Sequence, residues 1–590
     1  MQPVDLTTLK AVCHELRSHW LPARCEQVIQ RDRHTICMAL RTFDKRGWLT
    51  ISWHPQAARL HMGSAPPRQP DTFTFSQQLK HQVNGLALTS LNFLSPWERA
   101  LDLQFAPRPG DQIRWHIYVE IMGKYSNVLL TNAQQEIITA AHQVSEKQSS
   151  IRPISTGDRY QHPPAIVGTL PKPSDTFEIW QSRVGLVPGK LRKMLLQAYS
   201  GLSSALIRQL VGAAKLDPEQ LTTSLTSADW HRLYDQWQRW LTALATQTFQ
   251  PGWLETGYTV LGLGDFEPAP DVQSLLERYY HDQLNQQIFA QLHHRLSQKL
   301  KTLLTKLRQK ADAFNIRLAQ SDQADTYRAQ ADLLMAHLHQ WQPGLQSLEL
   351  ADFTTGEPVA IALNPEKNAV QNAQTLYKRH QKLKRTRDAV MPLLETVRSE
   401  LRYLEQVESA LVQITEYAHP DDLEALQDIR DELIQQGYMS DPYQRPKANK
   451  TPNFHRFTTP DGHELIVGRN NNQNDYLTTK VATSYDLWLH TQEIPGSHVL
   501  LRLNAGEVAS DADLAYAADM AAYFSRARHS EQVPVVYTKP KHVYKPKGER
   551  PGMVIYKHEH IVWGQPQRAK AWIETAGDAR ALAEKGLAKI

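Results

Sequence analysis

Residues 454–501 have the sequence FHRFTTPDGHELIVGRNNNQNDYLTTKVATSYDLWLHTQEIPGSHVLL, which favours a small sheet with polar loops. Asp461-Gly462 lies between two strand-like runs, a pattern that predicts a two-residue hairpin. Gly468 follows the second run and precedes seven polar side chains, namely Arg469, Asn470, Asn471, Asn472, Gln473, Asn474 and Asp475. Such side chains can hydrogen-bond phosphates, sugars or base edges. The stretch therefore predicts an α+β domain with loops suited to RNA.

The same domain continues to a basic run at 537–552, YTKPKHVYKPKGERPG. Its cations outnumber the single acid Glu549, and Tyr537 and Tyr544 lie between them; these cations are Lys539, Lys541, Lys545, Lys547 and Arg550. Cations interleaved with aromatic rings suit phosphate contact and stacking on exposed bases. The alternative is a lysine-rich edge loop that charge keeps soluble. Between the two runs, Ser510 and Asp513 predict a capping box at the start of a helix.

Composition points to a cytoplasmic protein of several domains. The chain has 590 residues, 41% hydrophobic and 22% charged, with a net charge of +5, so any nucleic-acid surface must be local. Its three cysteines, Cys13, Cys25 and Cys37, form no CxxC pair, which disfavours a metal site and fits a reducing compartment. The start of the chain lacks the pattern of a signal peptide, and no apolar run has the length of a membrane span.

The first 170 residues mix helices and strands. A helix is expected to begin near Asp5, and strands are expected at Thr35–Arg41, Gly47–Ser52, Ala87–Phe93, Ala100–Phe105 and Gln112–Ile121. The segment EIMGKYSNVLL, residues 120–130, predicts a strand, a turn at Gly123 and a second strand. Its turn offers a cation, an aromatic ring and two hydrogen-bonding tips, which are Lys124, Tyr125, Ser126 and Asn127. The alternative is an ordinary polar hairpin.

Helices dominate the middle of the chain. Gly201-Leu202-Ser203-Ser204 precedes a helix whose first amides could hold a phosphate, although helical turns of this kind are common. Residues 275–340 and 368–415 predict two long helices, and the second has apolar residues seven apart, at Leu376, Leu383, Val390, Val397 and Leu404. We therefore predict an antiparallel coiled coil with a small module at its tip. A basic face near the tip is either solvated or an RNA contact, and consists of Lys378, Arg379, Lys382, Lys384, Arg385 and Arg387.

Common catalytic motifs are missing. The sequence has no GxxxxGK[ST], GxGxxG, GxSxG or HExxH. The strongest catalytic candidates are Asp486, His490, Ser497 and His498, as nucleophile, base and orienter or as metal ligands. Hydrogen bonding to a backbone or a ribose is the favoured role, so we predict no catalytic residue, metal or cofactor. A polar, proline-containing linker, SDPYQRPKANKTPN, precedes the C-terminal domain.

The chain also resembles a known family. Five segments are similar to the NFACT-R domain: DGHELIVGRNNNQND, DLWLH, PGSHV, AADMAAYFSRAR and VVYTKPKHVYKPKGERPGMV. The EIMGKYSNVLL turn resembles the NFACT-N signature, and residues 371–374, 377–378 and 382–384 resemble the entry to the family's second coiled-coil helix. The chain is thereby identified as a member of the NFACT family, of the bacterial RqcH type related to eukaryotic NEMF, often labelled fibronectin-binding protein A-like.

The resemblance implies an α+β multidomain fold. An NFACT-N domain at 1–172 is expected to be similar in fold to formamidopyrimidine-DNA glycosylase but to lack its chemistry. A helix-hairpin-helix domain at 173–255 and an antiparallel coiled-coil arm at 270–440, with a tip module near 340–367, are expected to follow. The NFACT-R RNA-binding domain at 452–567 and a tail at 568–590 complete the chain.

The resemblance also implies a function. Family members bind large ribosomal subunits obstructed by peptidyl-tRNA, recruit charged tRNA and direct template-free tailing of the stalled chain, with alanine in bacteria, for degradation. Such a protein is a positioning factor, because the ribosome forms the peptide bond. It is expected to act as a monomer on the ribosome, with other quality control factors as further partners and no membrane.

Family motifs carry over to particular residues. Asp5 matches an N-terminal aspartate used for tRNA recognition, and Glu98-Arg99 matches an Asp-Arg pair. The departure at Glu98 keeps the charge but lengthens the side chain by one methylene. The predicted tRNA-binding set also includes Glu120, Met122, Gly123, Lys124, Tyr125, Ser126 and Asn127. The predicted RNA-binding set of the C-terminal domain is Arg469, Asn470, Asn471, Asn474, Asp475, His490, Ser497, His498, Lys539, Lys541, Lys545, Lys547 and Arg550.

Two other classes remain as alternatives. A surface adhesin that binds fibronectin needs export, and the sequence shows no export signal. A DNA-repair glycosylase needs a processed N-terminal nucleophile, usually Pro after Met, whereas Gln2 precedes Pro3 here.

Overall fold

The computed structural model describes residues 1–67, 71–145, 147, 149, 152–164, 167–440 and 452–573. The chain divides into two compact units, Met1–Leu284 and Asn285–Ile590. Residues 441–451 of the predicted linker and residues 574–590 of the predicted tail lie outside the described residues. Helices and antiparallel sheets occur in both units, so the predicted α+β multidomain class is confirmed.

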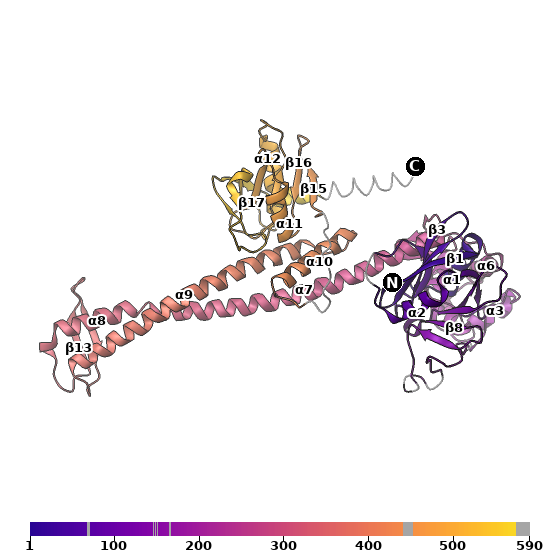
Figure 1. The fold of residues 1–590 in the computed structure, drawn as a ribbon, viewed down its shortest axis with the longest axis horizontal. Coiled ribbons are helices and arrows are strands. Elements are labelled where there is room, and N and C mark those ends of the chain that lie inside the picture. The colour runs from indigo at the N-terminus through magenta and orange to yellow at the C-terminus, as the bar shows by residue number, and fades with distance from the viewer. Residues whose placement is uncertain are drawn as a thin grey trace. The chain divides into compact units, whose positions relative to one another are not determined.

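Unit 1 is built on a nine-stranded antiparallel sheet with the order β4-β3-β2-β1-β5-β6-β7-β8-β9. Helices α1 (Leu6–Trp20) and α2 (Thr74–Val83) pack on this sheet and bury Leu9, Val12 and Leu79 in its core (Figure 1). The strands are β1 (Ala23–Asp32), β2 (Thr35–Arg41), β3 (Arg46–Ser52), β4 (Arg59–Gly63), β5 (Ala87–Phe93), β6 (Ala100–Ala106), β7 (Trp115–Glu120), β8 (Asn127–Asn132) and β9 (Ile137–Ala140).

The predicted strands of unit 1 are confirmed, with one substantial change of length. Strands β2 and β5 have the predicted bounds, and β3 and β6 differ by one residue. The strand predicted at Gln112–Ile121 is shorter, because the chain is still leaving the turn around Gly110, where φ is +91°. Helix α1 begins after Asp5 as predicted, and the Asp5 carboxylate accepts a hydrogen bond from the Thr8 backbone N–H.

A helical cluster completes unit 1. Helices α3 (Phe177–Val184), α4 (Leu191–Ala198), α5 (Ser204–Ala213) and α6 (Ser227–Thr246) share a core that includes the buried rings of Trp180, Trp237 and Trp240. A small sheet follows, with strands β10 (Gly252–Leu254), β11 (Gly257–Thr259) and β12 (Glu267–Pro268).

Two long helices form the arm of unit 2. Helix α7 (Val272–Ser321) starts in unit 1, and α9 (Ala369–Gln413) runs back beside it (Figure 1). The antiparallel direction is fixed by side-chain pairs, because Arg308 bonds Glu405 whereas Asn315 bonds Arg398. The predicted seam is largely confirmed, since Val390, Val397 and Leu404 are buried with residues of α7.

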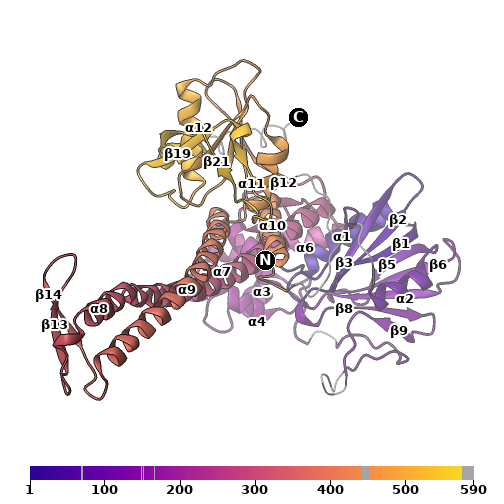
Figure 2. The same ribbon diagram turned by 60° about the vertical axis from the view of Figure 1, so that its left-hand side comes forward.

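The single helix predicted over 275–340 is wrong. Helix α7 ends at Ser321, and α8 (Ala324–Ala336) begins after a two-residue break. The Ser321 hydroxyl is buried and donates to the carbonyl of Leu318, a local hydrogen bond that competes with continued helix. The tip carries the hairpin of β13 (Ser347–Ala351) and β14 (Pro358–Ala362), and helix α10 (Pro420–Gln435) follows α9 (Figure 2).

The C-terminal domain, residues 452–573, holds a six-stranded antiparallel sheet with the order β15-β16-β18-β17-β19-β22. Its strands are β15 (His455–Thr458), β16 (Glu464–Val467), β17 (Leu487–Thr491), β18 (Val499–Leu501), β19 (Val533–Thr538) and β22 (His560–Gly564). Helix α12 (Asp511–Tyr523) covers one face (Figure 2). The other face carries α11 (Asn471–Tyr476), a π-helical turn at Leu477–Val481 and the hairpin β20 (Val543–Tyr544) with β21 (Ile555–Tyr556).

Two local predictions in this domain need correction. The β15–β16 hairpin has three loop residues rather than two, because Thr459 pairs with His463 and Gly462 has φ of +89° after a turn that Pro460 starts. The capping box at α12 is half formed. The Ser510 hydroxyl accepts from the Asp513 N–H, but the Asp513 carboxylate is occupied by His463.

No helix among the described residues is long and apolar enough to span a membrane.

Candidate functional site

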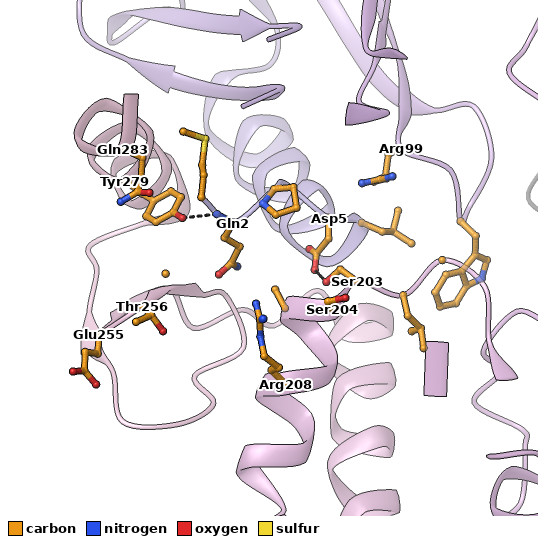
Figure 3. Close-up of a pocket in the computed structure, with 18 residues that line it drawn as sticks. Gln2, Asp5, Arg99, Ser203, Ser204, Arg208, Glu255, Thr256, Tyr279 and Gln283 are labelled. Atoms are coloured by element: carbon orange, nitrogen blue, oxygen red, sulfur yellow. Dashed lines mark hydrogen bonds between the residues drawn. The ribbon is translucent and has the colours of Figure 1, made fainter. Parts of the chain in front are cut away.

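A cavity of about 900 Å³ opens in unit 1, and we call it the N-terminal cavity (Figure 3). Its wall is formed by residues 1–6, the β5–β6 connection, the turn before α5, the β10–β11 turn and the start of α7. Asp5, Arg99, Ser203, Ser204 and Arg208 all line it. The structure therefore brings together Asp5, Arg99 and the Gly201–Ser204 turn, which lie far apart in the sequence.

Asp5 joins the starts of two helices at this cavity. One carboxylate oxygen caps α1, and the other accepts a hydrogen bond of 2.6 Å from the Ser203 hydroxyl. Ser203 is in turn the N-cap of α5 and accepts from the Leu206 N–H at 2.9 Å. The Asp5 side chain is buried, so its role in this conformation is to fix both helix ends against each other.

Arg99 is the half-buried cation of the cavity. Its guanidinium donates to the Val4 carbonyl at 3.3 Å, and burial lowers its pKa while the nearby Asp5 carboxylate opposes that shift. Glu98, which is predicted to act together with Arg99 on tRNA, is not among the residues that line the cavity. Sequence reasoning missed Arg208, which is exposed one turn after Ser204 on α5. Arg208 lies four residues after Ser204, and residues four apart lie on the same face of a helix, so this spacing could have predicted its place beside the turn.

The segment at 120–127 separates into a rigid base and an exposed tip. Glu120 is buried and accepts two hydrogen bonds from Arg152, at 2.9 and 2.5 Å, while Asn127 bonds the backbone of His142 at both ends of its amide. Ser126 bridges Met122 and Gly123. The tip is the 3-10 turn Gly123–Tyr125, where the Tyr125 side chain is 71% exposed and the Lys124 ammonium lies 4.9 Å from its ring centre.

The polar run after β16 is buried rather than displayed. Asn470 caps α11, and Asn470, Asn471 and Asn474 are all buried. The Asn474 side chain accepts from the His498 N–H at 3.0 Å, and the Asn471 amide donates to Glu432 of α10 at 3.0 Å. These side chains therefore hold the domain together in this conformation, and RNA contact by them stays a prediction.

The two predicted histidines of this domain, His490 and His498, also lie inside it. Burial lowers the pKa of His490 to about 4 and that of His498 to about 3, so both rings are neutral near pH 7. The His498 ring is bonded to the Thr478 hydroxyl at 2.7 Å. Asp486 is buried and bonds the Thr483 N–H and Arg502, while the Ser497 N–H donates to the Phe524 carbonyl.

The cations of the basic run, residues 537–552, fall into two groups. Lys545 pairs with Asp475 of α11, and the Arg550 guanidinium donates to the Tyr438 hydroxyl at 2.6 Å. The other three, Lys539, Lys541 and Lys547, are exposed. Sequence reasoning missed Lys557, which is also exposed and whose ammonium lies 5.7 Å from the ring centre of the exposed Tyr544. This exposed group can contact phosphates and stack on a base.

Comparison with known proteins places the chain in a family. Residues 5–452 match the model of the NFACT N-terminal and middle domains, and residues 453–558 match the NFACT protein RNA-binding domain. The Rqc2 homolog RqcH of Streptococcus suis is 31% identical over 576 residues, covering 94% of this chain and 97% of that protein. The Rqc2 homolog RqcH of Bacillus subtilis is 28% identical over 567 residues, covering 94% and 96%.

Solved structures give partial matches. The C-terminal part of the fibronectin/fibrinogen-binding protein from Streptococcus suis is 33% identical, with a TM-score of 0.37, and covers 47% of this chain and 95% of that one. The N-terminal part of the same protein is 23% identical, also with a TM-score of 0.37, and covers 47% and 98%. Because the two family models together span residues 5–558, the chain belongs to the NFACT family.

Proposed function

We propose that this chain is a ribosome quality control factor that binds large ribosomal subunits obstructed by peptidyl-tRNA and recruits charged tRNA to them. Support comes from its relatives named Rqc2 homolog RqcH and from the match of residues 453–558 to an RNA-binding domain. The observation that carries the tRNA part is the N-terminal cavity, where Asp5, Arg99 and Ser204 share one wall.

The N-terminal cavity is the proposed tRNA contact. Arg99 offers a planar fork that fits a phosphate or a guanine edge with two hydrogen bonds. Arg208 adds an exposed cation, and Asp5 holds the start of α5 in place through Ser203. The tip at Lys124 and Tyr125 supplies a second contact, a cation beside an exposed ring, while Glu120, Met122, Gly123, Ser126 and Asn127 shape that tip.

The exposed cations of the C-terminal domain are the proposed contact with the large subunit. Lys539, Lys541 and Lys547 are free to meet phosphates, and Tyr544 offers a stacking surface. The remaining predicted residues of this domain support the shape that presents these groups; they are Arg469, Asn470, Asn471, Asn474, Asp475, His490, Ser497, His498, Lys545 and Arg550.

The proposed role is positioning rather than group chemistry. The protein holds tRNA and subunit in register, and the ribosome's own centre forms the peptide bonds of a template-free tail, with alanine as the proposed residue, that marks the chain for degradation. The proposed place of action is the cytoplasm. The likeness of residues 1–172 to formamidopyrimidine-DNA glycosylase and the helix-hairpin-helix module at 173–255 belong to the same proposal.

Recovery of tRNA with tagged protein on large subunits tests this function. Arg99→Ala should lower tRNA recovery at least tenfold, the effect of losing about 1.4 kcal/mol of binding, while subunit recovery stays unchanged. Arg33→Ala, an exposed arginine outside the cavity, is the matched control and should behave as wild type. Equal tRNA recovery from Arg99→Ala and Arg33→Ala would remove the cavity from the proposal, and absence of the wild-type protein from large subunits would reject the function.

A further inference from the structure

A row of acidic side chains on α10 faces the polar run of the C-terminal domain. Asp422 lies 3.8 Å from Arg469, and Asp428 accepts from the amides of Asn470 and Gln473. Glu432 is one turn further along α10 and accepts from Asn471. Ser409 and Gln413 of α9 also hydrogen-bond the domain. We call the contact between the carboxylates of α10 and the polar run the docking joint.

Glu432 is the most deeply buried acid of the joint. Its side chain is 1% exposed and lies between α9, α10 and α11. One carboxyl oxygen accepts both from the Tyr403 hydroxyl of α9, at 2.8 Å, and from the Asn471 amide, at 3.0 Å. Tyr403 is fully buried as well, so this carboxyl group is one buried link between the arm and the domain.

A second layer covers this link. The Arg550 guanidinium lies 5.0 Å from the ring centre of Tyr403 and 5.7 Å from that of Tyr438. The Tyr438 hydroxyl accepts from Arg550 and donates to Glu400 at 2.9 Å. Arg550 therefore shields the carboxyl group from water but bonds Tyr438 rather than Glu432.

The surroundings disfavour a charge on Glu432. Burial raises the pKa of Glu432 to about 7, and the nearby Asp475 carboxylate acts in the same direction. Hydrogen bonds from Tyr403, Asn471 and the Asn472 backbone oppose the shift without cancelling it. The charged and titratable groups around the carboxyl come from each element of the joint: Tyr403 and Glu400 of α9, Asp428 of α10, Asp475 of α11, Tyr438, Lys545 and Arg550.

We infer that the carboxyl group of Glu432 is a protonation switch that sets how firmly the C-terminal domain is docked on the arm. Undocking removes the cover of the C-terminal domain from this carboxyl and brings its pKa toward the ordinary value of 4.5. Docking therefore takes up a proton between pH 4.5 and about 7. The docked state is stabilised as pH falls. Above pH 7 its stability is lowest and no longer depends on pH. Across the span from pH 8 to pH 6, the docked-to-undocked ratio should rise about tenfold.

Single-molecule energy transfer on the full chain tests the switch. Dyes on Arg402→Cys of α9 and Lys480→Cys of the C-terminal domain report docking, since both positions are exposed and the native cysteines Cys13, Cys25 and Cys37 are buried. A urea concentration is chosen at which the wild type shows both populations at pH 7. The docked-to-undocked ratio should then rise about tenfold from pH 8 to pH 6.

Variants assign the effect to one carboxyl group. Glu432→Gln keeps an acceptor for Tyr403 and Asn471 without the charge, so it should be more docked at pH 8 and show no change with pH. Asp431→Asn removes an exposed carboxylate from the same helix and should keep the wild-type response. Tyr403→Phe removes one donor to the charged form and should move the transition to higher pH.

Two results overturn the inference. One is a wild-type ratio that is equal at pH 6 and pH 8 while Tyr403→Phe also shows no transition. The other is a Glu432→Gln variant that keeps the full wild-type response. Neither measurement needs RNA or ribosomes, so failure here leaves the proposed function untouched.

Discussion

Asp5 and Asp513 each connect the start of a helix to a residue distant in sequence. Asp5 caps α1 and holds the cap of α5 through Ser203, and Asp513 binds His463 at the start of α12. In both cases the partner is distant in sequence, so a local capping pattern predicts the helix start but not the second contact. Helix caps at such junctions fix the position of neighbouring elements as well as their length.

Removal of the Asp5 carboxylate should loosen the N-terminal cavity. Asp5→Ala is expected to lower the free energy of unfolding by about 1–2 kcal/mol, because one helix cap and one interhelix hydrogen bond are lost. Ser203→Ala removes the shared bond, so the double variant should cost less than the sum of the single ones. Denaturant unfolding followed by tryptophan fluorescence measures this, and simple additivity would contradict the shared bond.

His463 should make one end of the C-terminal domain sensitive to pH. Its ring lies between Asp513, at 2.6 Å, and Glu507, at 2.9 Å, and hydrogen bonds to both carboxylates raise its pKa. This contact stabilises the domain fully at pH values below the ordinary histidine pKa of 6.5. The stabilisation is lost as pH rises through the raised pKa of His463. Hydrogen exchange at residues 459–463 should therefore quicken at high pH beyond the intrinsic rate, and His463→Gln should abolish that change.

At the scale of elements, the sequence predicts the regular parts well. Strand-like runs of apolar residues place β2 and β5 to the residue, and the heptad spacing identifies the seam of α9. The break between α7 and α8 escapes prediction because no proline or glycine marks it in the sequence. The burial of the polar run after β16 also escapes prediction. Asn470, Asn471 and Gln473 bond acids of α10, and a pattern of neighbouring residues does not contain that contact.

The same limit applies to the basic run. The sequence gives five equivalent cations, but Lys545 is paired with Asp475 while Lys547 is exposed. Lys547→Ala should reduce the slope of log affinity for large subunits against log salt by about one, because one phosphate contact and its released counterions are lost. Lys545→Ala, the matched variant in the same loop, should change the slope less. Equal slopes for wild type and Lys547→Ala would mean that this loop only keeps the domain soluble.

On the scale of the whole molecule, the proposed tRNA and subunit contacts belong to different compact units. The N-terminal cavity lies in unit 1, and the exposed cations of the basic run lie in unit 2. A positioning factor requires this separation, because each partner must be held without competing for the same cations. The two contacts share no residue, so their losses should be independent.

Combined variants test that independence. A triple variant with Lys539, Lys541 and Lys547 replaced by alanine should weaken subunit binding and flatten its salt dependence, but leave the amount of tRNA per recovered subunit unchanged. Arg99→Ala should lower that tRNA amount at unchanged subunit affinity. In the quadruple variant the two free-energy losses should add within about 0.5 kcal/mol, as expected for sites without shared partners. Titration of large subunits with and without charged tRNA measures both terms. A loss in the quadruple variant no greater than that of either parent would mean that tRNA and subunit are bound by one continuous surface, and the division of labour between the units would then be wrong.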